Sequence, residues 1–320
     1  MTTLYSLDQL ENPLVNPVLT IGNFDGVHRG HLALFDAVKG RAREIDGQSV
    51  VLTFDPHPIK VMKPQNAPPL ITPTEQKLQL IEAAGIDVIL CLRFTREFAS
   101  LSAEDFIQNI LVRKIGIREL VVGYDYAFGR NREGNTASLK AAGRKFGFKV
   151  HVMDPVRIDS NLVSSTAIRQ LVQTGQLDEA KKLLGRNYQI TGIVKTGMNR
   201  GGRLLGFPTA NLNVVDELVP QRGVYAVKVI TDSGSYQGVT NIGYNPTFEN
   251  NAFSIETHIL DFNENLVGKT IRVRFIARIR QEQKFESVAA LAEQIRKDIL
   301  QAREIFARNH ERSATEPPAS

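Results

Sequence analysis

The sequence has 320 residues, of which 42% are hydrophobic and 23% are charged, and its formal net charge is +5 at pH 7. This length and composition are typical of a soluble globular protein with two domains of ordinary size. The positive charge is mild and spread along the chain, so a phosphate-bearing small ligand explains it as well as nucleic acid does. We expect no nucleic-acid partner.

A single cysteine, Cys91, excludes an intrachain disulfide and a zinc site built from several cysteines. It lies in the apolar run DVILCLRF, which favours a buried and inert thiol. No apolar run approaches the roughly 18 residues of a membrane span, and the start MTTLYSLDQL lacks the pattern of a signal peptide. We therefore expect a cytoplasmic protein without membrane contact.

Strand and helix patterns alternate through the first half of the chain. An apolar strand pattern ends at Gly22, and an amphipathic helix pattern begins near His31. In TPTEQKLQLIEAAG, the pattern predicts a helix that Thr72 caps, with Glu75 completing a capping box. This alternation predicts a doubly wound parallel sheet covered on both faces. Ligands bind beyond the carboxyl ends of such strands, where the turn after Gly22 would lie.

The second half follows different rules, because strand patterns succeed one another without helices between them. They are YQITGIVK, VYAVKVIT, YQGVTNIG, FSIETHILDF and TIRVRFIARIR, and the turn TDSGS is typical of a hairpin. We expect a small antiparallel barrel or sandwich, closed by a helix over about 287–308. The predicted domains are residues 1–185 and 186–308, followed by a disordered tail over 309–320.

The stretch GNFDGVHRGH contains the first candidate site. Gly30 allows the backbone to approach a ligand, and His28, His31 and the unpaired N–H groups of a helix start form a compact site for phosphate oxygens. Two histidines can stabilise charge that develops on a phosphate under attack. The alternative is a glycine turn with solvent-facing histidines, but the strand before and the helix after favour the functional interpretation.

Hydroxyl groups cluster in LVSSTAIRQLV, where Ser164, Ser165 and Thr166 precede a helix and Arg169 follows about one turn later. Such hydroxyls usually satisfy only the helix N-terminus, which is the simpler interpretation. The alternative is that Arg169 reaches triphosphate oxygens.

Aromatic residues lie among glycines in VVGYDYAFGRNREGN, where tucked-in rings are the simpler interpretation. The alternative is a surface for a flat ring, with Asp125 able to accept a ring N–H.

The second half carries its own polar motifs. GGRLLGFPTANL is a glycine-rich loop that can wrap phosphates, and its Thr209 and Asn211 supply oxygen ligands suited to Mg²⁺. In SIETHIL the strand alternation places Glu256 and His258 on one face. Glu256 is therefore a candidate general base, and a surface glutamate is the alternative.

Together these motifs resemble one family, the bacterial bifunctional riboflavin kinase/FMN adenylyltransferases, also called FAD synthetases. The resemblance is collinear over about residues 15–308. The motifs that carry it are GNFDGVHRGH, TFDPHP, GYDYAFG and SSTAIR in the first half, and GFPTAN, GVYA, NIGYNPTF and IETHILDF in the second.

For the first half the resemblance implies a nucleotidyltransferase domain that transfers an adenylyl group from ATP to FMN, which gives FAD and pyrophosphate. It implies that His28 and His31 act on the ATP phosphates, and that the flavin is held by Phe54, Asp125 and Phe128. The implied ATP contacts are Gly22, Phe24, Gly26, Gly30, Ser164, Ser165, Thr166 and Arg169.

For the second half the resemblance implies phosphorylation of riboflavin to FMN by ATP. Thr209 and Asn211 would hold Mg²⁺ with ATP, Gly202 and Arg203 would contact ATP, and Glu256 would be the base. The expected partners are thus ATP, riboflavin and FMN, and a homo-oligomer stays open. Two rival hypotheses are an adenylyltransferase of another substrate with a degenerate second domain, and a flavin-binding module without chemistry.

Overall fold

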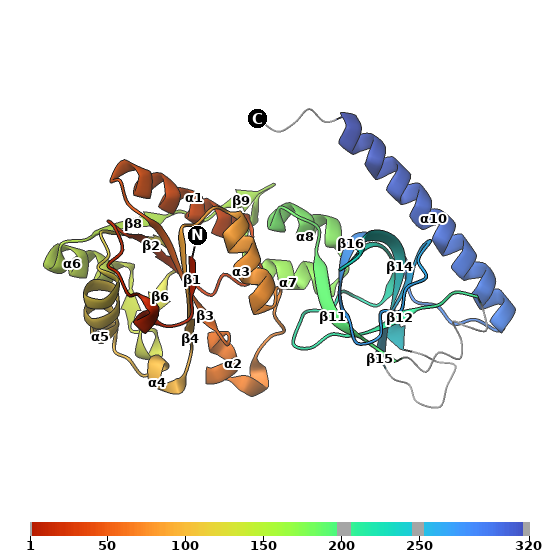
Figure 1. Cartoon of the computed structure of the whole chain (residues 1–320), viewed down its shortest axis with the longest axis horizontal. Coiled ribbons are helices and arrows are strands. Elements are labelled where there is room, and N and C mark those ends of the chain that lie inside the picture. Colours follow the sequence, from red (N-terminus) through yellow and green to blue (C-terminus); the bar gives the residue numbers. More distant parts are fainter. Residues whose placement is uncertain (1, 197–205, 245–252, 316–320) are drawn as a thin grey trace. The chain divides into compact units, whose positions relative to one another are not determined.

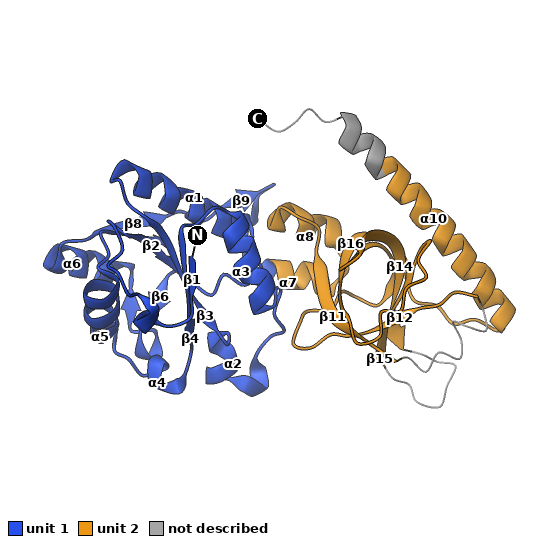
Figure 2. Cartoon of the chain, in the orientation of Figure 1, with its two compact units in different colours: residues 1–167 blue, residues 168–320 orange. Residues whose placement is uncertain are grey.

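A computed structural model describes residues 2–196, 206–244 and 253–315, with side chains up to residue 308. The chain forms two compact units, Met1–Ala167 and Ile168–Ser320 (Figure 2). The division falls inside the helix α7 (Ser165–Gln173). The next helix, α8 (Leu177–Leu184), therefore belongs to the second unit, although the sequence pattern suggested a boundary after residue 185.

The first unit is built on a six-stranded parallel sheet (Figure 1). Its order is β1-β4-β3-β2-β5-β8, so the chain first adds strands on one side of β2 and then on the other, which confirms the doubly wound fold. The reversal lies between β2 and β5. The strands are β1 (Thr2–Leu4), β2 (Val18–Ile21), β3 (Ser49–Asp55), β4 (Val88–Arg93), β5 (Glu119–Gly123) and β8 (Lys149–Met153).

Helices cover both faces of this sheet, since strands that are apolar on both sides must be buried on both sides. Phe35 and Val38 of α1 pack on one face, and Phe106 and Leu111 of η3 pack on the other. The helices are α1 (Arg29–Glu44), α2 (Pro58–Met62), α3 (Thr74–Ala83), α4 (Arg96–Ala99), α5 (Ala103–Asp105), the π-helical η3 (Phe106–Ile115) and α6 (Thr136–Phe146). Short elements complete the unit: η1 (Leu7–Gln9), η2 (Pro64–Asn66), β6 (Ala127–Phe128), η4 (Arg130–Arg132), β7 (Gly134–Asn135), β9 (Arg157–Ile158) and β10 (Asn161–Leu162).

Cys91 lies on β4 with 2% of its surface exposed, as its apolar surroundings in the sequence predict. Burial raises the pKa of its thiol. The neighbouring Lys77 is also buried, and its ammonium donates to the carbonyl oxygen of Phe54 (2.8 Å).

The predicted cap of α3 is wrong. The helix begins at Thr74, and Pro73 precedes it without a capping side chain. The Thr72 hydroxyl instead accepts a hydrogen bond from the N–H of Gly26 (3.1 Å), so it anchors a loop rather than the helix.

The second unit is a closed barrel in which every neighbouring pair of strands is antiparallel, which confirms the barrel alternative. The strand order is β11-β12-β15-β14-β13-β16. The sequence motif GFPTANL suggested only a loop where β12 lies. The strands are β11 (Gln189–Lys195), β12 (Ala210–Asn213), β13 (Gly223–Thr231), β14 (Gly234–Tyr244), β15 (Phe253–Ile259) and β16 (Thr270–Arg280).

The closing helix, α10 (Val288–Thr315), packs its Ala302 and Phe306 against Val224 and Val239 on the outside of the barrel. It continues through residue 315, so the tail predicted to begin at 309 is helical there, and residues 316–320 lie outside the described part. Among the described residues no helix has the length and apolar character to cross a bilayer.

Two fragments test where the second domain begins. Leu177, Leu183 and Leu184 of α8 are buried, and full burial of one leucine contributes about 1.5–3 kcal/mol. A fragment over 168–315 should therefore be more stable than one over 186–315 by several kcal/mol, measured by urea unfolding with circular dichroism. Equal unfolding midpoints would instead support a domain that starts at residue 186.

Candidate functional site

The loop after β2 lies at the reversal point of the sheet and is held by a buried carboxylate. Phe24 has φ of 50° and Gly26 has φ of 90°. Glycine adopts a positive φ readily, but for phenylalanine this conformation is unfavourable. The Asp25 carboxylate accepts hydrogen bonds from the N–H groups of Ile71 (3.0 Å) and Thr72 (3.1 Å). These bonds fix the loop before any ligand binds.

Both histidines of GNFDGVHRGH lie at the N-terminus of α1. Nδ1 of His28 accepts a hydrogen bond from the N–H of His31 (3.3 Å), and the two rings stack with centroids 3.5 Å apart. Phe24 packs edge-on against His31, with centroids 5.2 Å apart. A Cβ at Gly30 would lie 3.2 Å from the His28 ring. The imidazoles therefore stand beside a helix start, where N–H groups and the helix dipole favour an anion.

Phe24 is buried, so its side chain supports His31, and only its backbone remains for the ATP contact that the resemblance implied. The glycines around it serve the same packing. A Cβ at Gly22 would lie 2.9 Å from the Phe24 ring, and one at Gly26 would lie 3.2 Å from Ile71.

The motif SSTAIR meets this loop within the first unit. The Ser165 hydroxyl donates to the carbonyl oxygen of Asp25 (2.8 Å), and Ser164 accepts from the N–H of Ala167 (3.2 Å), as an N-cap does. Thr166 is exposed at the start of α7. The structure thus brings the serines to the histidine loop, although the two motifs are far apart in the sequence. Arg169 follows on α7, beyond the division between the units.

The three predicted flavin contacts differ in exposure. Asp125 is exposed, whereas Phe54 and Phe128 are each 8% exposed and belong to one hydrophobic core. Phe128 stacks on Tyr126 with centroids 5.6 Å apart, and burial raises the pKa of the Tyr126 hydroxyl. Phe54 lies edge-on to Phe98 at 5.4 Å. The phenylalanines form a supporting layer, and Asp125 is the accessible group.

In the barrel, β12 and β15 bring three predicted residues together. The pairing register places Asn211 directly opposite Glu256. His258, next on the same face of β15, donates from Nδ1 to the carbonyl oxygen of Pro208 (2.8 Å) and so holds the segment that carries Thr209. The result is an amide, a hydroxyl and a carboxylate on neighbouring strands. Gly202 and Arg203 lie outside the described residues.

Oxygen donors of this kind suit Mg²⁺, which typically takes one or two protein groups together with substrate phosphates. Thr209 and Asn211 offer such donors, and Glu256 lies next to them. No group of three or more His, Cys, Asp and Glu side chains with metal-site geometry occurs among the described residues. The hydroxyl and amide oxygens of Thr209 and Asn211 fit a metal that arrives with a phosphate ligand.

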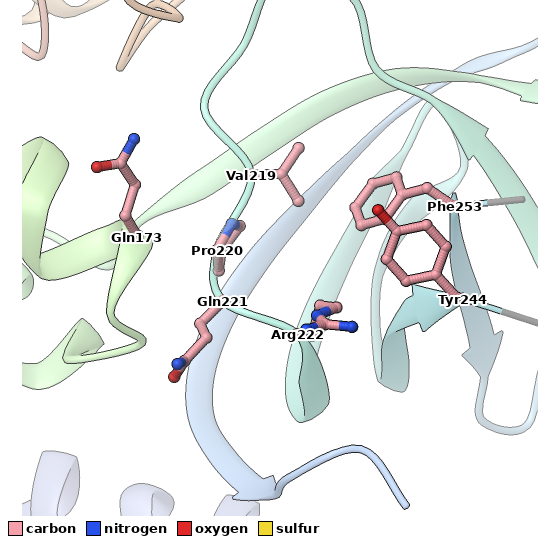
Figure 3. Close-up of a pocket in the computed structure, with 7 residues that line it drawn as sticks. All are labelled: Gln173, Val219, Pro220, Gln221, Arg222, Tyr244 and Phe253. Carbon is pink, nitrogen blue, oxygen red and sulfur yellow. The ribbon is translucent and has the colours of Figure 1, made fainter. Parts of the chain in front are cut away.

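A pocket of about 390 Å³ opens at one end of the barrel (Figure 3). Tyr244 and Phe253 pack edge to face there with ring centroids 5.7 Å apart, and the Arg222 guanidinium lies 5.4 Å from the Tyr244 ring. Aromatic walls with a few polar groups suit a planar ring. Sequence reasoning missed this pocket, although Tyr244 stands in the quoted motif NIGYNPTF. Its lining residues are Gln173, Val219, Pro220, Gln221, Arg222, Tyr244 and Phe253.

Two histidines at a helix N-terminus, at the reversal point of a doubly wound sheet, and a second unit whose barrel carries clustered oxygen donors are features typical of two-domain proteins that bind nucleotide phosphates. Comparison with known families agrees for each half. Residues 11–167 match the family model of FAD synthetase, and residues 184–306 match that of riboflavin kinase.

Full-length relatives carry both halves. A protein of Escherichia coli (strain K12) is 40% identical over 290 residues, which cover 90% of this chain and 92% of the relative. One from Haemophilus influenzae is 38% identical over 307 residues, covering 96% and 99%. Both are described as bifunctional riboflavin kinase/FMN adenylyltransferase. The chain belongs to this family, as the sequence motifs indicated.

Among solved structures, a Streptococcus pneumoniae protein described as a macrolide-efflux protein superposes with a TM-score of 0.82 at 32% identity. The match covers 94% of this chain and 98% of that one. The two-domain architecture is therefore shared over nearly the whole length.

The variant Thr72→Val tests the anchor of the histidine loop. Valine keeps the shape but leaves the buried N–H of Gly26 without its acceptor, so the free energy of unfolding should fall by about 1–3 kcal/mol. Thr74→Val is the matched control, because the Thr74 hydroxyl bonds Asp55 at the surface (2.6 Å) and its loss should cost less than about 1 kcal/mol. Denaturant unfolding measures both, and equal losses would contradict the anchoring role.

Proposed function

We propose that this protein makes FMN and FAD from riboflavin and two molecules of ATP, one reaction in each unit. The observation that carries the proposal is that each unit has its own cluster of residues suited to phosphate. The first has the His28–His31 pair at a helix N-terminus, and the second has Asn211 opposite Glu256. ATP, riboflavin and FMN are the proposed ligands, and the cytoplasm is the proposed location.

In the first unit, an oxygen of the FMN phosphate attacks the α-phosphorus of ATP. A P–O bond forms to FMN, the bond to the β-phosphate breaks, and pyrophosphate leaves with its electron pair. Because the attacking phosphate is already anionic, no base is needed. His28, His31 and the N–H groups of α1 bind the phosphate oxygens as charge develops on them.

The remaining residues of that site orient the reactants. Ser165 holds the loop through the Asp25 carbonyl, and Arg169 is proposed to bind triphosphate oxygens. The exposed Asp125 carboxylate is proposed to accept an N–H of the flavin ring, over the layer that contains Phe54 and Phe128.

In the second unit, the terminal hydroxyl of the riboflavin side chain attacks the γ-phosphorus of ATP, and Glu256 takes the hydroxyl proton. The bond to the β-phosphate breaks and ADP leaves. Thr209 and Asn211 would hold Mg²⁺ here, which when bound neutralises charge on the ATP phosphates. The aromatic pocket of Tyr244 and Phe253 is proposed to take the flavin ring.

The double variant His28→Ala/His31→Ala tests the assignment to the first unit. FAD formation from FMN should fall by at least about 100-fold, because donors that stabilise developing charge are lost. FMN formation from riboflavin should stay within twofold of wild type, since the barrel has its own site. Separation of the flavins by chromatography measures both products, and equal loss of both in a folded variant would refute two separate sites.

Glu256→Gln tests the base of the second unit. Glutamine keeps the size and a hydrogen-bonding oxygen but takes no proton, so riboflavin phosphorylation should fall about 10²–10⁴-fold with ATP binding little changed. Conversion of supplied FMN to FAD should be unaffected. Glu264→Gln, an exposed change in the same unit, is the control. FMN formation by Glu256→Gln at near wild-type rate would mean that the base lies elsewhere.

A further inference from the structure

Three polar residues form a row across the outer face of the barrel. β15 pairs with β12 on one side and with β14 on the other, and the two registers place Asn211 and Asn241 both opposite Glu256. The next residues, Thr240 and Thr257, are fully buried and bond each other inside the barrel (2.8 Å). Because successive side chains of a strand alternate between faces, Asn211, Glu256 and Asn241 share the outer one. Directly opposed Cβ atoms lie about 4.5–5.5 Å apart.

Asn241 stands where the apolar contact with α10 ends. Its other neighbour, Val224 on β13, is buried with Ala302 and Phe306 of that helix. An apolar side chain at position 241 would have extended this contact, but the sequence has an amide there. Asn241 is half-buried, and its side-chain amide makes no hydrogen bond within the part of the chain that the structure describes. A half-buried amide of this kind is available to a ligand.

The two amides that flank Glu256 face different surroundings. Asn211 follows Thr209 on the segment that His258 holds, which is the side of the proposed phosphate and metal ligands. Asn241 is on β14, on the other side of Glu256 from these ligands, and its side chain shares the outer face with the Glu256 carboxylate. With the phosphates of ATP on the Asn211 side, the acceptor hydroxyl would approach Glu256 from the Asn241 side.

We propose that Asn241 binds the hydroxyl chain of the acceptor, at the 4′-hydroxyl next to the 5′-hydroxyl that is phosphorylated. An amide offers both a donor and an acceptor, which matches a hydroxyl group. Glu256 and Asn241 on adjacent strands then contact adjacent hydroxyls, which fixes the 5′-oxygen for attack. The proposal deepens the kinase reaction proposed above and rests on it.

The test compares riboflavin with 4′-deoxyriboflavin as substrates of the full-length protein. The wild type should phosphorylate the deoxy compound with a kcat/KM at least about 10-fold lower than that for riboflavin, because Asn241 loses its hydrogen-bond partner. Asn241→Val should lower kcat/KM for riboflavin to that same level, leave the deoxy compound little changed, and bring the ratio of the two close to one. The KM for ATP should not move.

Gln237→Val is the matched control, since Gln237 lies on the same face of the same strand and is half-exposed, but pairs with Lys228 on β13 and not with Glu256. It should keep the wild-type ratio. If circular dichroism shows that Asn241→Val is unfolded, Asn241→Ser takes its place. Serine has a shorter side chain, and the same fall in the ratio is expected.

Equal use of the two compounds by the wild type would overturn the proposal without any variant. A folded Asn241 variant that keeps the wild-type ratio, or that raises the KM for ATP alone, would overturn it as well. If the wild type makes no FMN from riboflavin, both this proposal and the proposed kinase function are overturned. Normal FMN formation with an unchanged ratio would overturn this proposal alone.

Discussion

The first site depends on the hydrogen bonds that the buried carboxylate of Asp25 accepts from the loop before α3. Phe24 and Val27 on either side of Asp25 have positive φ angles, and each such conformation costs about 1–3 kcal/mol. A hydrogen bond to a charged acceptor contributes about 1.5–3 kcal/mol, and Asp25 accepts from the N–H groups of both Ile71 and Thr72. The gain and the strain are of similar size, so the loop keeps its shape only while all its anchors are present.

These anchors explain why motifs that are far apart in the sequence act together. The Thr72 hydroxyl accepts from Gly26, and the Ser165 hydroxyl donates to the Asp25 carbonyl, so the segments before α3 and at the start of α7 both hold the turn after β2. The stacked histidines follow directly from that turn. Hydrogen bonds to the loop backbone thus organise the site, so the loop needs little further ordering when a ligand binds.

Local patterns in the sequence were sufficient for the parallel sheet and for the position of the histidines at the carboxyl ends of its strands. They failed at Thr72, because a capping signature considers only neighbouring residues. The Thr72 hydroxyl instead bonds the N–H of Gly26, which is remote in the sequence. They also could not separate buried from exposed aromatics, so the 8% exposure of Phe128 and its place in the core came only from the structure. Alternation in SIETHIL correctly placed Glu256 and His258 on one face, but which residues stand opposite them depends on the register of β12 and β14.

The burial of Cys91 has a practical consequence for spectroscopy. It is the chain's only thiol, it is 2% exposed, and burial raises its pKa, so the thiolate that would attack a maleimide or a thiol-reactive nitroxide label is scarce. A cysteine introduced at an exposed position in either unit would therefore be labelled selectively in the otherwise native sequence. Two such cysteines, one in each unit, would report the distance between the two labelled positions in solution, with and without nucleotides.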